Sequence, residues 1–554
     1  MSRQSIGCKF CFVIYYKSRR FFTLNVVQTK AQIVIPLVMV NFGVSRACDT
    51  CKKRRKKCDE TRPACLRCIK SRHQCPGYKD DSSLFFRHYS PRNKLVTPTL
   101  ERWLPNADYM LEATAIDIFL DELVVRSLDR NHSRGFLDGM HDTFAASTPK
   151  STLMSAAKVV VLASLANRHR RQSLFSMVRK QYGQLLGDYV ASLSLSSESL
   201  SPEQFFTAVL LGIYELMACN IASPTRHLIH VQGLGSILQR GISSSPSTSH
   251  IGVHLPGTWL ISKGAVLSRN RPEDTFLTDA EISQAHTQGA GILCPPLNDN
   301  PQRSLDQIMV QLAPLTARSE KLLANPAPSR SALLDLYQAL IVFRNEIAFW
   351  ADSQPPAWRP ELVGHVLEDS PTAREIPWIC AGPVEKYFDL FVGTAWNSWR
   401  SMYIVWLDQL YHVSKALGQR EFIPHYVDIV GSLVAGLKAS IPYHLCRNVE
   451  EYIKNVNAGI ADLQTNQLSG GLLLFHHLYS IGRCTIVDAS TRQYLANVLK
   501  WIGNEMGIGN ATVLSECLRP DEQGPSVMQN SKISFMDALE GYYLITASMM
   551  SKSA

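Results

Sequence analysis

The sequence predicts an all-α protein in which a short cysteine-rich module precedes a large helical domain. Six of the 14 cysteines fall between Cys48 and Cys75. From about Asp108 onward, apolar residues recur at the three- and four-residue spacing that places them on one face of a helix. The alternation of apolar and polar residues that is typical of half-buried strands is rare. These three observations together favour two parts of very different size.

The overall composition is that of an ordinary globular protein. The chain has 554 residues, of which 45% are hydrophobic and 19% are charged, so it can bury a sizeable core. No apolar run reaches about 18 residues, so we expect no membrane span. No secretory signal with a small-residue cleavage site is visible, and we therefore expect a reducing compartment.

The positive charge is concentrated in one window. The chain carries a formal net charge of +10. The segment Arg46–Lys79 holds 12 Lys and Arg against 3 Asp and Glu, and the rest of the chain is almost balanced. A short, strongly basic segment is the electrostatic footprint of a nucleic-acid contact.

The chain divides into four parts by composition. Residues 1–45 form a basic arm that contains no acidic residue. Three interpretations of this arm remain open: a mitochondrial presequence, a disordered arm, or a segment upstream of a true translation start at Met39, which we favour. The module follows at 46–79, a polar linker that includes Pro91 and Pro98 at 80–107, and the helical domain at 108–554. No sustained heptads follow the module, so a coiled coil is not indicated there.

The helical domain begins with a clear amphipathic segment, because five apolar residues from Ile116 to Val124 follow the spacing of one helix face. Ser/Pro/Gly-rich breaks at 242–257 and 353–360 interrupt the later pattern. We expect further helices at 153–166, 173–194, 203–219, 226–240, 303–324, 331–351, 386–413, 422–440, 448–464, 470–480, 490–507 and 534–550.

The six clustered cysteines follow the pattern C-x2-C-x6-C-x6-C-x2-C-x6-C, which is two copies of C-x2-C-x6-C. Each copy supplies three thiolates, whereas a closed tetrahedral zinc site needs four ligands. Six cysteines fill the eight positions of two Zn²⁺ ions only if two sulfurs bridge, and the repeat makes Cys48 and Cys65 the natural bridges. We therefore expect one zinc on Cys48, Cys51, Cys58 and Cys65, and the other on Cys65, Cys68, Cys75 and Cys48.

Other interpretations of the module explain less. A disulfide framework would need an oxidising compartment, and a redox C-x-x-C enzyme would not need six regularly spaced thiols. Each C-x2-C suits the first turn of a helix, where free N–H groups favour thiolate charge. Pro63, in the connector, should stiffen the turn between the halves.

The two halves differ in their spacers. The first spacer is the basic run Lys52–Lys57, whereas the second, Ile69–Gln74, is mixed. Since adjacent cations repel one another unless an anion lies alongside, we expect the first helix to face DNA. The arginines would contact guanine bases and the lysines would contact phosphates. The expected DNA-binding residues are Lys52, Lys53, Arg54, Arg55, Lys56 and Lys57.

The segment ACDTCKKRRKKCDETRPACLRCIKSRHQCPGY resembles the DNA-binding module of fungal transcription factors with a six-cysteine binuclear zinc cluster. The resemblance implies two short helices around the shared zincs, with the first entering the major groove at its C-terminal end to read CGG-like triplets. It places Arg54 and Arg55 in the groove and Lys53 and Lys57 near phosphates, and Pro63 matches the loop proline of the family.

The remainder resembles, more distantly, the helical fungal-specific regulatory domain that often follows such clusters. This likeness rests on Leu210–Leu216, on His230-x-x-Gly233 with Leu238–Gly241 after it, and on the stretch from Trp501 to Ile508. It implies control of a metabolic pathway, including secondary metabolism.

The sequence thus predicts a nuclear, sequence-specific transcription regulator of the RNA polymerase II type. Its expected partners are double-stranded DNA and the transcription machinery or co-regulators; a small-molecule effector and a homodimer are compatible with the sequence. We expect no catalytic residues, because the chain contains no HExxH, GxSxG or P-loop motif. His227 and His230 are expected to be packed rather than to bind a ligand. The alternative is a helical ligand-binding or enzymatic domain that the cluster merely anchors to DNA.

Overall fold

The computed structural model describes two compact units, Met1–Pro105 and Asn106–Ala554. The described residues are 11–13, 23–25, 48–54, 56–59, 61, 63–76, 107–194, 201–240, 293, 305–460, 463–519, 541–542 and 544–545. Within these ranges no helix combines the length and the hydropathy needed to span a bilayer.

The first unit contains the cysteine module with two short helices, α1 (Asp49–Lys53) and α2 (Leu66–Lys70). A small antiparallel pair also occurs, in which β1 (Cys11–Val13) lies beside β2 (Thr23–Asn25). The sequence did not predict these strands within the basic arm. The expected linker at 80–107 falls almost entirely outside the described residues.

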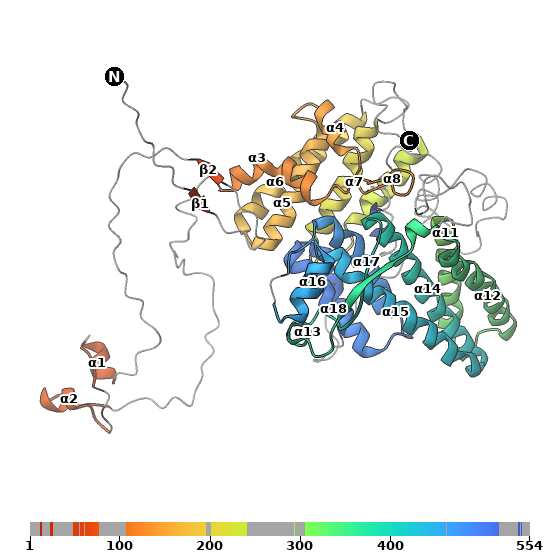
Figure 1. The fold of residues 1–554 in the computed structure, drawn as a ribbon. Coiled ribbons are helices and arrows are strands. Elements are labelled where there is room, and N and C mark those ends of the chain that lie inside the picture. The colour runs from red at the N-terminus through yellow and green to blue at the C-terminus, as the bar shows by residue number, and fades with distance from the viewer. Residues whose placement is uncertain are drawn as a thin grey trace, which may run out of the picture. The chain divides into compact units, whose positions relative to one another are not determined.

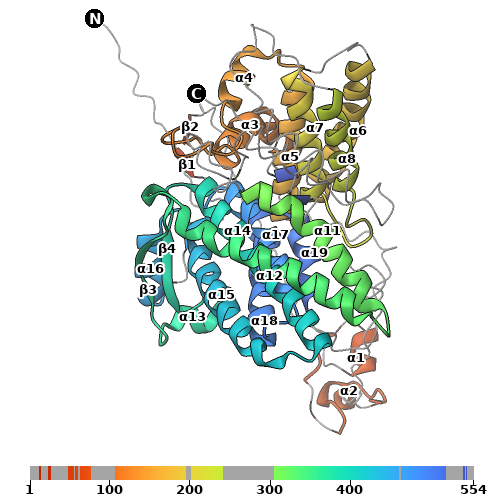
Figure 2. The same cartoon turned by 90° about the vertical axis from the view of Figure 1, so that its right-hand side faces the viewer.

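The second unit is predominantly helical, as the sequence predicted (Figures 1 and 2). In its first part, α5 packs against α3, α6 and α7, and α8 packs on α7; in its second part, α14 packs against α12, α15 and α17, and α18 packs on α17 and α19. The helices are α3 (Ala107–Glu122), α4 (Met140–Ala146), α5 (Thr152–His169), α6 (Gln172–Ser194), α7 (Pro202–Met217), α8 (His227–Arg240), α11 (Leu305–Ala324), α12 (Arg330–Ser353), α13 (Pro371–Glu375), α14 (Leu390–Leu417), α15 (Ile423–Leu445), α16 (Val449–Asn457), α17 (Leu468–Arg483), α18 (Ala489–Trp501) and α19 (Gly509–Leu518), with short turns η4 (Pro356–Trp358), η5 (Arg420–Phe422) and η6 (Ile502–Met506).

Local sequence signals fix several helix ends. Ser201 caps α7 in a reciprocal capping box with Gln204, and Pro202 occupies the first helical position. Asp488 caps α18 by accepting the N–H of Thr491. The helix α14 ends at Gly418, whose φ of +79° suits glycine. The helix α16 stops well before the expected residue 464, because the chain turns at Gly459 with a φ of +75°.

Buried apolar residues lie on the helix face that the apolar spacing predicted, and others lie on helices that are enclosed by their neighbours. On the first predicted helix face, Phe119 of α3 is buried, while Leu123 and Val124 are buried just after α3 ends at Glu122. The helices α7 and α17 are buried along almost their whole length, as expected for helices enclosed by others.

One feature of the second unit departs from the helical expectation. The strand β3 (Glu361–Val366) pairs antiparallel with β4 (Gly382–Lys386). The strand β3 packs against α16, and β4 packs against α15 and α16. The hairpin follows the predicted break at 353–360, which the structure confirms as the end of α12. The expected helix at 534–550 lies mostly outside the described residues, although 541–542 and 544–545 are helical.

Several histidines of the second unit are buried or half-buried in polar contacts. His230 Nε2 lies 3.0 Å from the Tyr182 hydroxyl, His444 Nε2 lies 3.1 Å from Asn397 Nδ2, and His477 Nδ1 lies 3.1 Å from Ser401 Oγ. Burial lowers the pKa of His230 and of His444 to about 4, and that of His477 to about 3. These side chains are therefore neutral in the folded state at pH values where an unfolded histidine is protonated.

This burial should make the helical unit sensitive to acid. Because the folded pKa values lie below the unfolded value of about 6.5, the unfolded state binds more protons below that pH. The stabilisation is complete above about pH 6.5 and is lost as the pH falls toward 4, by about 1 kcal/mol per histidine at pH 5.5. Thermal midpoints of the full chain between pH 7.5 and 5 would measure this loss.

A histidine variant isolates the effect from general acid denaturation. His444→Gln should shrink the dependence of the midpoint on pH, whereas His365→Gln, at an exposed position of β3, should leave it unchanged. An equal dependence in both variants would show that the buried histidines are not its source.

Candidate metal centre and nucleic-acid interface

Each C-x2-C pair sits at the start of a short helix, as the sequence predicted. The N–H of Cys51 donates to Cys48 Sγ at 3.4 Å, and the N–H of Cys68 donates to Cys65 Sγ at 3.3 Å. Cys65 is the N-cap of α2. Free N–H groups of a first helical turn stabilise negative charge on sulfur. The two halves of the module therefore repeat the same local geometry.

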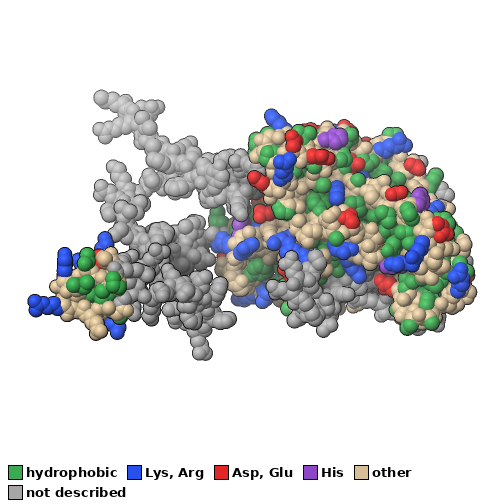
Figure 3. All heavy atoms as spheres, turned by 90° about the horizontal axis from the view of Figure 1, so that it is seen from below, with side chains coloured by type: hydrophobic (Ala, Val, Ile, Leu, Met, Phe, Trp, Pro, Cys, Tyr) green, Lys and Arg blue, Asp and Glu red, His purple; other side chains and the backbone are tan. Residues whose placement is uncertain are grey.

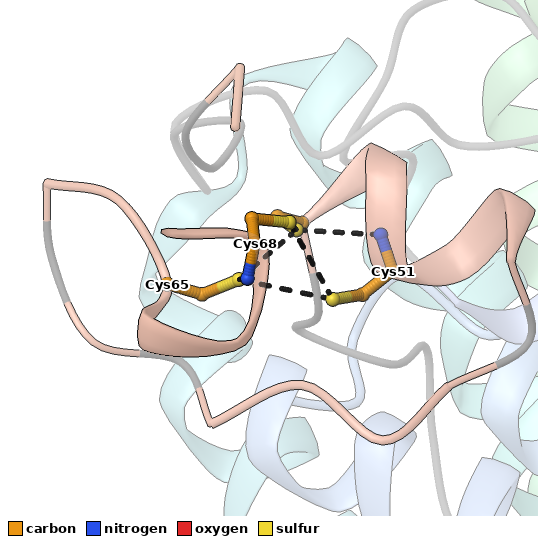
Figure 4. A group of neighbouring side chains, drawn as sticks. Cys51, Cys65 and Cys68 are labelled. Carbon is orange, nitrogen blue, oxygen red and sulfur yellow. Dashed lines mark hydrogen bonds between the residues drawn. The ribbon is translucent and has the colours of Figure 1, made fainter. Parts of the chain in front are cut away.

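The buried sulfurs converge on one point (Figure 4). Cys48 Sγ lies 3.7 Å from the Sγ atoms of Cys65 and of Cys68, while Cys51 Sγ lies 3.7 Å from Cys65 Sγ and 3.8 Å from Cys68 Sγ. Two thiolates on one tetrahedral zinc, at Zn–S of about 2.3 Å, stand about 3.8 Å apart. The observed spacings thus fit sulfurs that share zinc ions.

The remaining two cysteines complete the cluster from its edge. Cys58 and Cys75 are half-buried and pack against the four inner cysteines. Cys58 interacts with Cys51, and Cys75 interacts with Cys48 and accepts the N–H of Cys65 at 3.4 Å. The six cysteines are thus brought together, with one outer cysteine for each half.

Burial of these sulfurs disfavours their charge when no cation is near. It raises the pKa of the Cys48 thiol to about 12 and also raises the pKa of Cys51 and of Cys65. A bound Zn²⁺ supplies the opposite charge that keeps such groups as thiolates. The donor set and its surroundings therefore suit a soft, divalent cation.

Asp59 organises the connector between the halves, and sequence reasoning missed it. Its carboxylate accepts the N–H groups of Leu66 at 3.1 Å and of Arg67 at 2.8 Å, and also contacts Thr61. Desolvation acts to raise the pKa of Asp59, but these hydrogen bonds outweigh it and hold the pKa below its usual range. The signal was the acidic residue directly after Cys58, which could have been considered as a cap for the next helix.

The basic run Lys52–Lys57 is less helical than expected. The helix α1 ends at Lys53, so Arg54 lies in the turn that follows the helix and not in the helix itself. Hydrogen bonds from Arg54 N to Thr50 O and from Lys56 N to Cys51 O turn the chain. The physical reason is the short spacer, since the chain must leave the helix to return Cys58 to the cluster.

The module nevertheless presents its cations to solvent. Lys53, Arg54, Lys56 and Lys57 are exposed, and basic side chains project from the outline of the module in Figure 3. Arg55 and the side chain of Lys52 fall outside the described residues.

Comparison with known proteins agrees with this geometry. Residues 46–83 match the fungal Zn(2)-Cys(6) binuclear cluster domain, so the chain carries a two-zinc cluster module of the kind found in fungal transcription regulators. The match and the assembled cysteines establish two zinc ions as its cofactors and support a DNA-binding role in transcription.

Two relatives illustrate how far the similarity extends. The chain is 28% identical over 422 residues to transcription factor dbaG of Emericella nidulans, which covers 75% of this chain and 94% of that protein. It is 54% identical over 37 residues to white-opaque regulator 2 of Candida albicans, where the match covers only 7% of this chain and 8% of that protein. No solved structure matches the chain significantly.

Proposed function

We propose that this protein is a sequence-specific transcription regulator of the RNA polymerase II type, which reads CGG-like triplets in the major groove and acts in the nucleus. One observation supports this above all: a run of cations, exposed wherever the structure describes their side chains, is attached on both sides to a compact six-cysteine cluster. Such a cluster fixes the backbone from which the cations project, and fixed cations can both neutralise phosphates and contact bases.

Within this proposal, the cysteines and the basic residues of the module have different roles. All six clustered cysteines bind zinc, and Cys48 and Cys65 bridge the two ions. Arg54 and Arg55 contact guanines in the groove, and the lysines of the basic run contact phosphates. Arginine suits the O6 and N7 pair of guanine because its guanidinium donates two parallel hydrogen bonds, whereas lysine acts as a point charge.

Two substitutions in the full chain separate base reading from phosphate binding. Arg55→Ala should relax base preference, with a loss of about 1–3 kcal/mol on the preferred site only. Lys57→Ala should weaken all sequences similarly and reduce the salt dependence by about one phosphate, or about 0.9 in the logarithmic slope. Fluorescence anisotropy titrations on preferred and scrambled duplexes across salt concentrations would measure both effects. Equal affinity of the wild-type chain for both duplexes at moderate salt would defeat the proposal.

The helical unit offers a place where a small molecule could regulate this activity. A cleft of about 750 Å³ lies between α3, the start of α14 and the segment 446–450. Its buried carboxylate, Asp389, already caps α14 by accepting the N–H of Val392 and also accepts the Ser133 hydroxyl. That carboxylate is occupied by structural hydrogen bonds, and the cleft mixes apolar and charged lining residues, which suits the binding of a small effector.

We further propose that this effector tunes contact with co-regulators of a metabolic or secondary-metabolite pathway. A metabolite that raises the thermal midpoint of the full chain would identify it.

A further inference from the structure

The basic run is anchored by the second half of the module as well as by its own backbone. The guanidinium of Arg54 donates from Nη1 to Ser71 Oγ at 3.2 Å. The guanidinium of Arg67 donates from Nη1 to the carbonyl oxygen of Lys57 at 2.9 Å. One bond thus holds a side chain near the beginning of the run, and the other holds its last residue.

The two anchors are coupled on α2. Arg67 and Ser71 are four residues apart, which places them on the same side of a helical turn. The Ser71 hydroxyl donates to the Arg67 carbonyl oxygen at 2.7 Å, so its lone pairs remain available to accept from Arg54. The backbone N–H of Arg67 in turn donates to Asp59 at 2.8 Å, which fixes the start of α2 relative to the connector.

The positive charge of the basic run explains why its side chains and backbone need these hydrogen bonds. Six consecutive cations repel one another and gain little by packing, since the described ones are exposed. Without an external acceptor, the Arg54 guanidinium would sample many rotamers, and ordering a long side chain on binding costs affinity and orientation. Neutral acceptors such as Ser71 Oγ hold the guanidinium without cancelling the charge that DNA requires.

We propose that Arg67 and Ser71 are positioning residues for DNA recognition, which orient the basic run without contacting the bases themselves. The inference rests on the proposed DNA interface of the run. It assigns the second half of the module a defined part in specificity: Ser71 orients Arg54, and Arg67 fixes the path of the chain at Lys57, on either side of Arg55.

The test compares matched pairs of variants in the full chain. Ser71→Ala removes the acceptor for Arg54, whereas Ser71→Thr keeps a hydroxyl. Arg67→Met removes the donor to Lys57 O, whereas Lys70→Met removes one cation from an exposed position of the same helix without touching either anchor. For each protein, the affinities for a preferred duplex and a scrambled duplex, their salt slopes and the zinc content would be measured.

Ser71→Ala and Arg67→Met should each keep two zinc ions and lower the ratio of preferred to scrambled affinity about fivefold, which corresponds to about 1 kcal/mol. Ser71→Ala should leave the salt slope unchanged because it removes no charge. Ser71→Thr should discriminate like the wild type, and Lys70→Met should weaken both duplexes equally.

Three outcomes would overturn the inference. The first is a Ser71→Ala variant that discriminates like the wild type, and the second is a Lys70→Met variant that loses as much discrimination as Arg67→Met. If Arg67→Met loses zinc, its DNA affinity reports on the cluster, and the comparison of Ser71→Ala with Ser71→Thr decides whether the inference holds. The third is a wild-type chain that does not discriminate between duplexes, which would defeat the proposed function as well. Discrimination by the wild type with no change in Ser71→Ala would defeat only the positioning role.

Discussion

Cys65→Ser should remove both zinc ions and lower specific DNA affinity by at least about 100-fold, because a bridging sulfur belongs to both coordination spheres. The module has only a small apolar interior, made of its own cysteines, so metal binding has to supply its folding free energy, about 10–16 kcal/mol for structural zinc in small domains. Cys65 is fully buried, and its sulfur lies within 3.7 Å of those of Cys48 and Cys51. Zinc content per chain, measured by native mass spectrometry together with DNA titration, checks this result.

A non-bridging cysteine provides the comparison. Cys58→Ser should retain one zinc ion more often than Cys65→Ser, because Cys58 lies at the edge of the cluster and, in the proposed ligand set, binds one ion only. Cys219→Ser, in the helical unit, should keep two zinc ions. If Cys65→Ser and Cys58→Ser lost the same amount of zinc, Cys65 would not be a bridge.

Arg400→Met should destabilise the helical unit by about 3 kcal/mol, because it removes a buried guanidinium from its ion pair and leaves the half-buried Glu385 carboxylate in place. Arg400 is 4% exposed and donates to Glu385 at 2.9 Å, to the Tyr387 hydroxyl at 2.8 Å and to Asn397 at 3.0 Å. These contacts tie β4 to α14. Removal of the guanidinium takes one donor from each of these acceptors, although Glu385 still accepts from the Tyr387 hydroxyl and Asn397 still accepts from the Ser440 hydroxyl.

A double variant tests whether the pair itself is responsible. Arg400→Met combined with Glu385→Gln should recover part of the loss, since the second change removes the unpaired carboxylate. Arg374→Met, at an exposed position, should change the thermal midpoint very little. A double variant less stable than the sum of the two single variants would contradict a dominant pairwise contribution.

The surroundings of Arg400 show why this site had no sequence signal. Its partners Glu385 and Tyr387 lie 13–15 residues earlier in the chain, and only the hairpin brings them back. Gly436 on α15 also contributes, because a Cβ there would lie 2.8 Å from Arg400 Nε. A glycine in a helix is no sign of such a close approach unless the neighbouring helix is known.

The helices were largely predictable because their apolar period is strong and their caps are local. The α5 and α12 helices, for example, begin at serine caps and differ from the expected ranges by only a few residues. The hairpin was not predictable, because β3 is mostly exposed and offers no alternating burial pattern to detect. Its formation depends on packing against α15 and α16, which is tertiary information.

The cysteine cluster was predictable because the regular spacing of the six cysteines marks them in the sequence, and the structure brings these six residues together. The contacts that support the cluster could not be predicted from the sequence. Asp59, Arg67 and Ser71 act through hydrogen bonds between the two halves, and their geometry depends on where α1 ends. The sequence predicted that the first helix faces DNA, whereas the return of the chain to Cys58 already ends that helix at Lys53.

The central claim is that the zinc cluster makes this protein a reader of DNA sequence. Selection of duplexes from a random pool by the zinc-loaded full chain, repeated after chelation, tests it most directly. We expect enrichment of CGG-like triplets with zinc and none after chelation, because both the fold and the orientation of the basic run depend on the metal. Recovery of no common motif, or recovery of the same motif from the metal-free chain, would contradict the claim.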